Sequence, residues 1–253
     1  MEVDYSQILK ELGVEKGRTV LCHSAMYSMG FVKAPQKILV KAAESVLGSS
    51  GSFITPTFTY SAFNSEVFDP LSTVSKVGIL GDFISSVGVR NSEPNFSHSG
   101  FGQSVFDILN WESKTPFLGK DGFYSRLEED DALILLFGVD FDSLPVFMHC
   151  EVLSQVPYRK RKLFSGKVKT LNGILDVICT HDVRDDNRIP NTDRTRMGTY
   201  LKSVKDYREI KIRNGSIRCI PIKTVINCTN KKIESNPNYL LNEFNPFIES
   251  RKS

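Results

Sequence analysis

The stretch RTVLCHSAMYSMGFVKAPQKILVKAAESVLGSSGSFITPTFTY, residues 18–60, decides the fold class of this chain. It opens with a short β-branched run that ends in His-Ser, which predicts a buried strand leading into a loop. Residues 34–51 have apolar side chains three and four apart, with Pro35 suited to a first helical turn and Gly48 to a helix end. A second strand follows and ends at Pro56. This strand–loop–helix–strand order predicts a parallel α/β unit with a right-handed crossover.

Regular patterns continue on both sides of this unit. Residues 4–13 and 76–89 have helical periodicity, and we expect the second helix to be interrupted or bent near Gly81. Residues 131–142, DALILLFGVDFD, contain an aliphatic run closed by a glycine, which predicts a deeply buried strand. Ligands bind beyond the carboxyl ends of the strands in such sheets, so the segments that follow the strands are the first places to search for a site.

The C-terminal half has the alternating pattern of antiparallel strands. Apolar and polar residues alternate around the Asn-Gly pairs at 172–173 and 214–215, and Asn-Gly favours two-residue hairpin turns. We therefore expect a single α/β domain over residues 1–238, with a parallel or mixed sheet core and flanking helices. Its part from about residue 163 should be antiparallel and β-rich, and residues 239–253 should form a loosely ordered tail.

The composition disfavours several classes of function. A net charge of +3 over 253 residues is too small to indicate a nucleic-acid or membrane partner. The chain lacks an apolar run of about 20 residues and the pattern of a signal peptide. Its five cysteines are odd in number and have no CxxC spacing, which disfavours a disulfide framework and a structural zinc site. We expect a cytoplasmic protein that contains no metal.

One of the four histidines, His149, lies between an apolar and a basic run in FDSLPVFMHCEVLSQVPYRKRK, residues 141–162. Such surroundings can hold an imidazole near neutrality, where it can act as a general base. A half-buried structural histidine is the equally favoured alternative. Glu151 would share a face with His149 on a strand but would lie on nearly the opposite face of a helix. On a helix, Asp140 or Asp142 would have to orient the ring.

Neighbouring residues allow other interpretations. Cys150 could form a Cys–His couple for nucleophilic catalysis, although a single cysteine among apolar residues is more often core packing. The basic run YRKRK at 158–162 could bind phosphate, although such runs are more often solvated surface. His98 and His181 are equally compatible with structural and functional roles.

The first strand end has the groups of an anion site. His23 and Ser24 offer a ring N–H, a hydroxyl and backbone amides, and Gly30 and Lys33 lie just before a helix N-terminus. The chain has neither Walker nor GxGxxG spacing, which disfavours a nucleoside triphosphate or nicotinamide site. The threonines of residues 55–59 could line a cleft, although threonine is also a good strand residue.

Taken in order, five segments over most of residues 18–160 resemble the aminoglycoside 3-N-acetyltransferase family. They are VLCHSAMYSMGF, VLGSSGSFITPTFTY, FDPLSTVSKVGILGDFI, GVRNSEPNFSHSGFGQ and ALILLFGVDFDSLPVFMHCE. The resemblance implies transfer of an acyl group, usually acetyl, from CoA to an amine on a sugar. Acetyl-CoA would be the co-substrate, and the reaction would need no metal.

The resemblance also implies roles for individual residues. His149 matches the family's catalytic histidine and Glu151 its nearby glutamate, although the family spacing His-x-x-Glu is shortened here to His-Cys-Glu. The shortening gives Asp140 and Asp142 more weight as partners of the ring. A loop that meets the CoA diphosphate and pantetheine arm would comprise His23, Ser24, Gly30, Phe31 and Lys33. The thioester channel would be lined by Pro56, Thr57, Phe58 and Thr59, whose hydroxyls or nearby amides would bind the thioester oxygen.

The second half of the chain is more similar to family members found with sugar and surface-polysaccharide biosynthesis. Aminoglycosides are polycations and should need an acidic pocket, whereas this chain is slightly basic and places YRKRK near His149. We therefore expect a nucleotide-linked amino sugar or a polysaccharide precursor as the acceptor. The alternatives are an aminoglycoside acceptor and a non-catalytic CoA- or sugar-binding module. The sequence leaves the oligomeric state open, a homodimer included.

Overall fold

The computed structural model describes residues 3–29, 34–184, 192–212 and 215–242. Gly30, Phe31 and Lys33, which were expected to contact CoA, lie outside these ranges. Most of the expected tail, from residue 243 onward, lies outside them as well. Within the described ranges, no helix is both long and apolar enough to cross a membrane.

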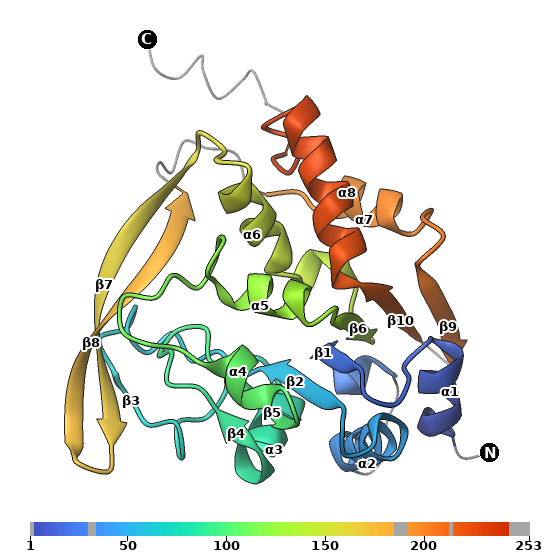
Figure 1. Ribbon diagram of the computed structural model, residues 1–253, viewed down its shortest axis with the longest axis horizontal. Helices are drawn as coiled ribbons and strands as arrows, with labels where there is room; N and C mark the ends of the chain where they lie inside the picture. Colours follow the sequence, from blue (N-terminus) through green and yellow to red (C-terminus); the bar gives the residue numbers. More distant parts are fainter. Residues whose placement is uncertain (1–2, 30–33, 185–191, 213–214, 243–253) are drawn as a thin grey trace.

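A seven-stranded mixed sheet forms the centre of the molecule, with strand order β4-β5-β2-β1-β6-β10-β9 (Figure 1). Its three central strands are parallel and comprise β2 (Ser52–Pro56), β1 (Thr19–Ser24) and β6 (Leu133–Phe137). Antiparallel strands extend it on both sides: β5 (His98–Gly102) and β4 (Val89–Arg90) beyond β2, and β10 (Gly215–Pro221) and β9 (Arg208–Ile212) beyond β6. The predicted α/β class with a parallel or mixed core is confirmed.

Helices cover both faces of this sheet because its central strands direct apolar side chains alternately to either side. In β6, Ile134 and Leu136 pack into one hydrophobic cluster, whereas Leu133, Leu135 and Phe137 pack into another. The first cluster is completed by α4 (Val105–Leu109), α5 (Phe123–Glu129), α6 (Val146–Leu153), α7 (Thr195–Leu201) and α8 (Ile222–Ser235). The second is completed by α1 (Tyr5–Glu11), α2 (Pro35–Leu47) and α3 (Ile79–Val87).

A smaller three-stranded sheet stands at one end of the molecule, on the left of Figure 1. Its long hairpin consists of β7 (Arg159–Thr170) and β8 (Gly173–Arg184), and β3 (Val67–Phe68) pairs parallel to β7. The turn consists of Leu171 and Asn172, one residue before the predicted Asn-Gly pair, and Gly173 begins β8 opposite Thr170 with a φ of 121°. Positive φ strains residues with a Cβ, which explains why the turn needs glycine. Short 3-10 turns, η1 (Met26–Met29) and η2 (Phe141–Ser143), follow β1 and β6.

The expected antiparallel, β-rich C-terminal part is confirmed by the pairs β7–β8 and β9–β10, and α7 and α8 also belong to it. The structure corrects one expected detail. The helix over 76–89 is continuous through Gly81 rather than bent there. A Cβ at Gly81 would lie 2.8 Å from the carbonyl oxygen of Pro56, so this glycine lets α3 approach the end of β2 closely.

Candidate active site

The carboxyl ends of the parallel strands meet at one edge of the main sheet, where three histidines gather. His23 lies near the end of β1 and pairs with Leu136 of β6. Pro56 ends β2 and pairs with His98 at the start of β5. His149 lies on α6, which follows β6 after a short turn. Segments that are distant in the sequence therefore converge where ligands bind in open α/β sheets.

Aromatic contacts join these histidines into one buried region. The His98 ring stacks on Phe123 with 3.9 Å between ring centroids. Tyr124 contacts Phe123 at 5.1 Å and the His149 ring at 5.6 Å. His23 is close enough to His98 for its charge to lower the pKa of His98 further, in addition to the larger effect of burial. All five side chains are buried.

Several polar atoms in this buried region have no hydrogen-bond partner among the residues that the structure describes. They are Nε2 of His23, both ring nitrogens of His98, the hydroxyl of Tyr124 and Nε2 of His149. Buried polar groups are normally hydrogen-bonded, because a polar group that loses its bonds to water and gains no new partner destabilises the fold. This group of unpartnered atoms at the carboxyl edge is the structural feature that best marks a ligand site.

The His149 ring is held by a backbone amide. Its Nδ1 accepts a hydrogen bond from the Gly119 N–H at 3.2 Å. A ring nitrogen that accepts carries no proton, so the neutral ring has its proton on Nε2. Burial lowers the pKa of His149 to about 4, and the ring is therefore neutral at neutral pH. In this arrangement Nε2–H is a donor that faces the buried region.

Glu151 pairs with Arg159 and Tyr158 rather than with His149. It lies on the same helix as His149, and two helical positions are separated by about 200° around the axis. The Tyr158 hydroxyl donates to Oε1 of Glu151 at 2.8 Å, and the Arg159 guanidinium contacts Oε2 at 2.6 Å. The side chains of Glu151 and Arg159 are only 1% and 7% exposed. This buried ion pair joins α6 to the start of β7.

Among the described contacts, neither Asp140 nor Asp142 reaches the His149 ring. Asp140 accepts a hydrogen bond from the Phe141 amide at 2.8 Å and forms an ion pair with Lys202. Partial burial alone would raise the pKa of Asp140, but the bonds from Lys202 and the amide lower it overall. Asp142 is exposed and lines an open hollow. The carboxylate expected to orient His149 is thus replaced by the amide of Gly119.

Arg194 lies between this hollow and the buried region. It lines the hollow with Asp142, and its Nη1 donates to the carbonyls of Asp142 at 3.0 Å and Leu144 at 2.9 Å. Burial lowers the pKa of Arg194, while the charge of Glu151 and the nearby Tyr124 act in the opposite direction. Neither Arg194 nor Tyr124 stands in a pattern that suggested a site from the sequence. Only the fold brings them beside the histidines.

The residues expected to line a CoA channel have mixed placements. His23 is buried, and burial lowers its pKa to about 4, whereas Ser24 is half-buried at the strand end. Thr57 and Thr59 are buried, and their hydroxyls bond within the protein, Thr57 to the Ser97 hydroxyl at 3.2 Å and Thr59 to the Pro94 carbonyl at 2.7 Å. These hydroxyls are therefore already engaged, and their contact with a thioester stays a prediction.

Pro56 and Phe58 border the same region. Pro56 pairs with His98, and the Phe58 ring meets the His98 ring edge-to-face at 5.2 Å. Their side chains thus help to enclose the unpartnered nitrogens of His98. Their predicted contact with CoA remains untested.

Cys150 has the surroundings of a core residue. It is buried on α6, where its thiol interacts with Thr229 of α8, and burial raises its pKa. Since the thiolate is the nucleophilic form, this thiol is poorly suited to attack. The structure favours the packing interpretation of Cys150.

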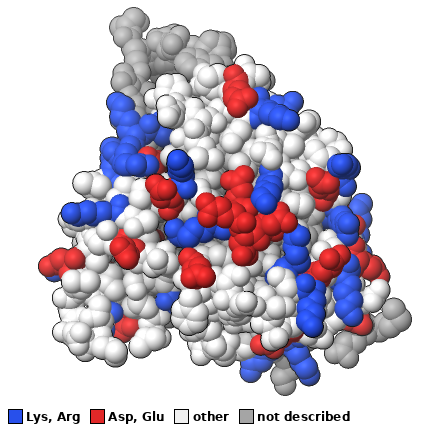
Figure 2. Space-filling view, in the orientation of Figure 1, with Lys and Arg blue, Asp and Glu red and all other residues white. Residues whose placement is uncertain are grey.

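The basic run at the start of β7 is largely compensated by acidic partners. Arg159 is buried against Glu151, and Arg161 pairs with Asp182 at 3.2 Å. Figure 2 shows both signs of charge over the face in view, with acidic side chains gathered near its middle. Lys160, Arg161 and Lys162 remain exposed, so part of the run lies on the surface, but the pairing of both arginines with acids weakens the case for an anionic acceptor.

Acid should destabilise the fold, because His23 and His149 are buried as neutral rings. Burial lowers both pKa values from 6.5 to about 4, so the unfolded chain binds more protons than the folded chain in this window. The free energy of unfolding should therefore fall as the pH falls from 6.5 toward 4, by about 3 kcal/mol for each ring. Urea unfolding followed by circular dichroism at a series of pH values measures this slope.

The variant His149→Gln supplies the control for this slope. It removes one of the three buried rings (His23, His98 and His149) whose pKa is lowered, so its stability should depend less steeply on pH than that of the wild type. An equal slope in the two proteins would show that His149 titrates normally in the folded state.

Comparison with models of known protein families identifies the family of this chain. The model of the aminoglycoside 3-N-acetyltransferase family matches residues 21–234. The chain belongs to the aminoglycoside 3-N-acetyltransferase family, as its sequence segments predicted.

A curated relative and several solved structures are similar to the chain. Aminoglycoside N(3)-acetyltransferase IV from Salmonella sp is 27% identical over 153 residues, which are 59% of this chain and 58% of the relative. The chain therefore matches little more than half the length of that relative. YokD from Bacillus subtilis has a TM-score of 0.78 and 19% identity, covering 93% of each chain.

Two further structures were solved with ligands. AAC-IIIb in binary complex with CoASH has a TM-score of 0.77 and 16% identity, covering 91% of this chain and 95% of the other. A histidine-to-alanine mutant of AAC(3)-IVa in complex with a gentamicin has a TM-score of 0.79 and 21% identity, covering 96% and 93%. At such identities the likeness establishes the shared fold. The comparisons give no support to the narrower resemblance to polysaccharide-biosynthesis members.

Proposed function

We propose that this protein transfers an acetyl group from acetyl-CoA to an amine of an aminoglycoside or a closely similar amino sugar. The main support is the family match over residues 21–234. Two proteins of the same fold add to it, one solved with CoASH and one with a gentamicin. Both arginines of the basic run are paired with acidic residues, so the run is a weaker reason for preferring an anionic acceptor.

The chemistry assigns His149 a part through its Nε2 atom. In the reaction the amine attacks the thioester carbon, the carbon–sulfur bond breaks, and the proton that the nitrogen loses passes to the leaving sulfur, which departs as the CoA thiol. A base role for His149 would need the ring proton to move from Nε2 to Nδ1, which the Gly119 amide opposes. A donor role needs no rearrangement, because Nε2–H can stabilise the negative charge that develops on the thioester oxygen. We favour the donor role, so the amine must reach the site unprotonated.

A thiol-release assay with acetyl-CoA tests the proposed function. The acceptors would be aminoglycosides, nucleotide-linked amino sugars and simple amino sugars, with mass spectrometry to detect the added acetyl group. We expect amine-dependent thiol release with aminoglycosides at rates well above those with nucleotide-linked sugars. Faster thiol release with nucleotide-linked sugars than with aminoglycosides would support the anionic acceptor instead.

The same assay separates the enzyme from a binding module. Calorimetric titration measures binding of acetyl-CoA independently of turnover. Binding without thiol release across the whole panel would contradict the proposed activity and support a non-catalytic module.

A further inference from the structure

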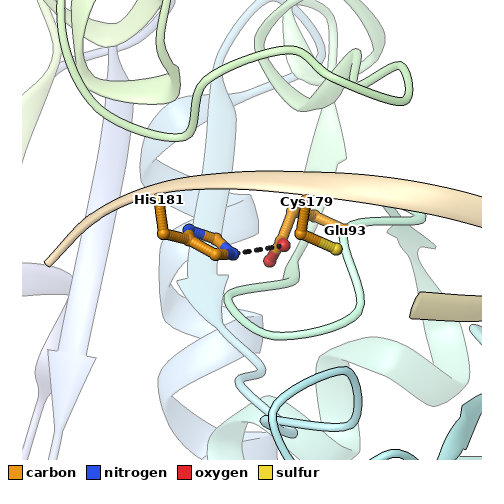
Figure 3. Close-up of side chains that lie close together, drawn as sticks. All are labelled: Glu93, Cys179 and His181. Atoms are coloured by element: carbon orange, nitrogen blue, oxygen red, sulfur yellow. Dashed lines mark ion pairs between the residues drawn. The ribbon is translucent and has the colours of Figure 1, made fainter. Parts of the chain in front are cut away.

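A second cluster of reactive side chains lies beneath the long hairpin, where Phe117 separates His181 from His98 of the candidate active site. Glu93 comes from the loop before β5, and Cys179 and His181 come from β8. Residues two apart on a strand share a face, so Cys179 and His181 point to the same side of the hairpin. Figure 3 shows the His181 ring facing the Glu93 carboxylate, with Cys179 beside that carboxylate. One possible ligand atom from each residue lies within 4.8 Å of the other two.

All three side chains are almost completely withdrawn from solvent. Their exposed fractions are 1% for Glu93, 0% for Cys179 and 4% for His181. Backbone amides of Asn95, at 3.0 Å, and of Phe96 donate to Oε2 of Glu93 and hold its carboxylate. The other oxygen, Oε1, faces His181, and the Cys179 thiol also interacts with the Glu93 carboxylate, which adds to the larger effect of burial in raising the pKa of that thiol. A buried carboxylate needs a cation or hydrogen-bond donors around it.

The His181 ring lies between two neighbours that need opposite protonation states of its Nε2 atom. Its Nε2 lies 3.3 Å from Oε1 of Glu93 and 3.0 Å from the side-chain nitrogen of Asn95. If Nε2 carries a proton, it can donate to Glu93, but its N–H then faces the N–H of Asn95. If Nε2 carries no proton, it can accept from Asn95, but its lone pair then faces the carboxylate of Glu93. Neither protonation state satisfies both neighbours. The rings of Phe63, Phe96 and Phe164 surround the imidazole and restrict its movement.

We infer that Glu93, Cys179 and His181 bind one divalent transition-metal ion, with Zn²⁺ as the best match, which fastens the β7–β8 hairpin to the loop before β5. Thiolate, imidazole and carboxylate are the ligands that Zn²⁺ takes in proteins. Two ligands at about 2.0 Å from a tetrahedral zinc ion lie about 3.3 Å apart. The observed separation of His181 Nε2 and Glu93 Oε1 is 3.3 Å.

A bound ion resolves both unfavourable contacts at once. The lone pairs of Glu93 Oε1 and His181 Nε2 would converge on the cation, and the Asn95 amide would turn away from Nε2. Cys179 would bind as the thiolate, releasing its proton to solvent when the metal enters. A fourth position would be left for a water molecule. The site is separate from His149, so it does not depend on the proposed acetyl transfer.

Metal binding by the full-length chain tests this inference. The purified protein would be treated with a chelator, dialysed, and titrated with Zn²⁺ or Co²⁺ alone. We expect one ion per chain and, with Co²⁺, a thiolate-to-metal charge-transfer band in the near ultraviolet. Excess Zn²⁺ should also raise the Tm by about 5 °C or more, because the ion binds only the folded state.

Variants assign the band to this cluster. Cys179→Ser should abolish the cobalt–thiolate band, and Glu93→Gln should weaken binding about tenfold or more, since even changes around metal ligands have effects of that size. Cys219→Ser, which removes another buried cysteine, should bind the metal as the wild type does. Absence of stoichiometric metal in the wild type, or an unchanged band in Cys179→Ser, would overturn the inference. Should Cys179→Ser fail to fold, the wild-type spectrum and Glu93→Gln decide it.

Discussion

Replacing His149 by alanine should lower the rate of acetyl transfer about 10²- to 10³-fold while leaving acetyl-CoA binding close to that of the wild type. The reason is that Nε2–H of this ring is the buried donor at the carboxyl edge of the sheet, with no protein partner among the described residues. Removing a donor to a developing oxyanion affects the transition state more than the bound substrate. Steady-state thiol release measures kcat, and calorimetry measures the binding of acetyl-CoA.

The control for this prediction is the neighbouring cysteine. Cys150→Ser should retain most of the activity, because the Cys150 thiol is packed against α8 and has a raised pKa. Loss of turnover in Cys150→Ser together with ping-pong kinetics would favour the cysteine nucleophile. Wild-type turnover in a folded His149→Ala variant would remove His149 from the reaction.

The pH dependence of kcat/KM separates the two roles of His149. Its pKa of about 4 means that the ring is neutral throughout the physiological range. With His149 as a donor, kcat/KM should rise with pH until the acceptor amine is deprotonated, and the profile should show no ionisation of His149 between pH 5 and 8. An enzyme ionisation near the ordinary histidine value would point to a base with an unperturbed ring.

Replacing Arg159 by alanine should lower the free energy of unfolding by about 3–5 kcal/mol. The change would leave the Glu151 carboxylate buried and without its cation, since both partners are almost fully enclosed. Urea unfolding at neutral pH measures the loss. The same change would also loosen the join between α6, which holds His149, and the start of β7.

Arg161→Ala is the matched control, because it removes the same side chain two residues further along the same strand. Its partner is Asp182, but the arginine is 50% exposed, so the loss should be below about 1 kcal/mol. The double variant Glu151→Leu with Arg159→Met should be more stable than Arg159→Ala, because a buried ion pair can be replaced by apolar groups. Equal losses in Arg159→Ala and Arg161→Ala would show that burial does not strengthen the first pair.

Much of the fold could be predicted because the information is local. The strands around Leu21 and Leu135 and the helix over 34–51 were visible as apolar runs and spacings, and the hairpin turn as an Asn-Gly pair. The last long helix was missed although Ile222, Val225 and Ile226 have helical spacing. The bend expected near Gly81 was wrong because that glycine serves a close contact with β2, which is not a local feature.

The sequence by itself determined the α/β class, the position of His149 beyond a strand end and membership of the family. Periodicity and the order of motifs can be read from the sequence without knowledge of any tertiary contact. Tertiary structure alone decided which groups meet. Glu151 pairs with Arg159 and not with His149, because Glu151 and His149 lie on different sides of the helix. The ring of His149 is held instead by the Gly119 amide. Glu93 and His181 are brought together across 88 residues of chain by hairpin packing, and no spacing rule could have paired them.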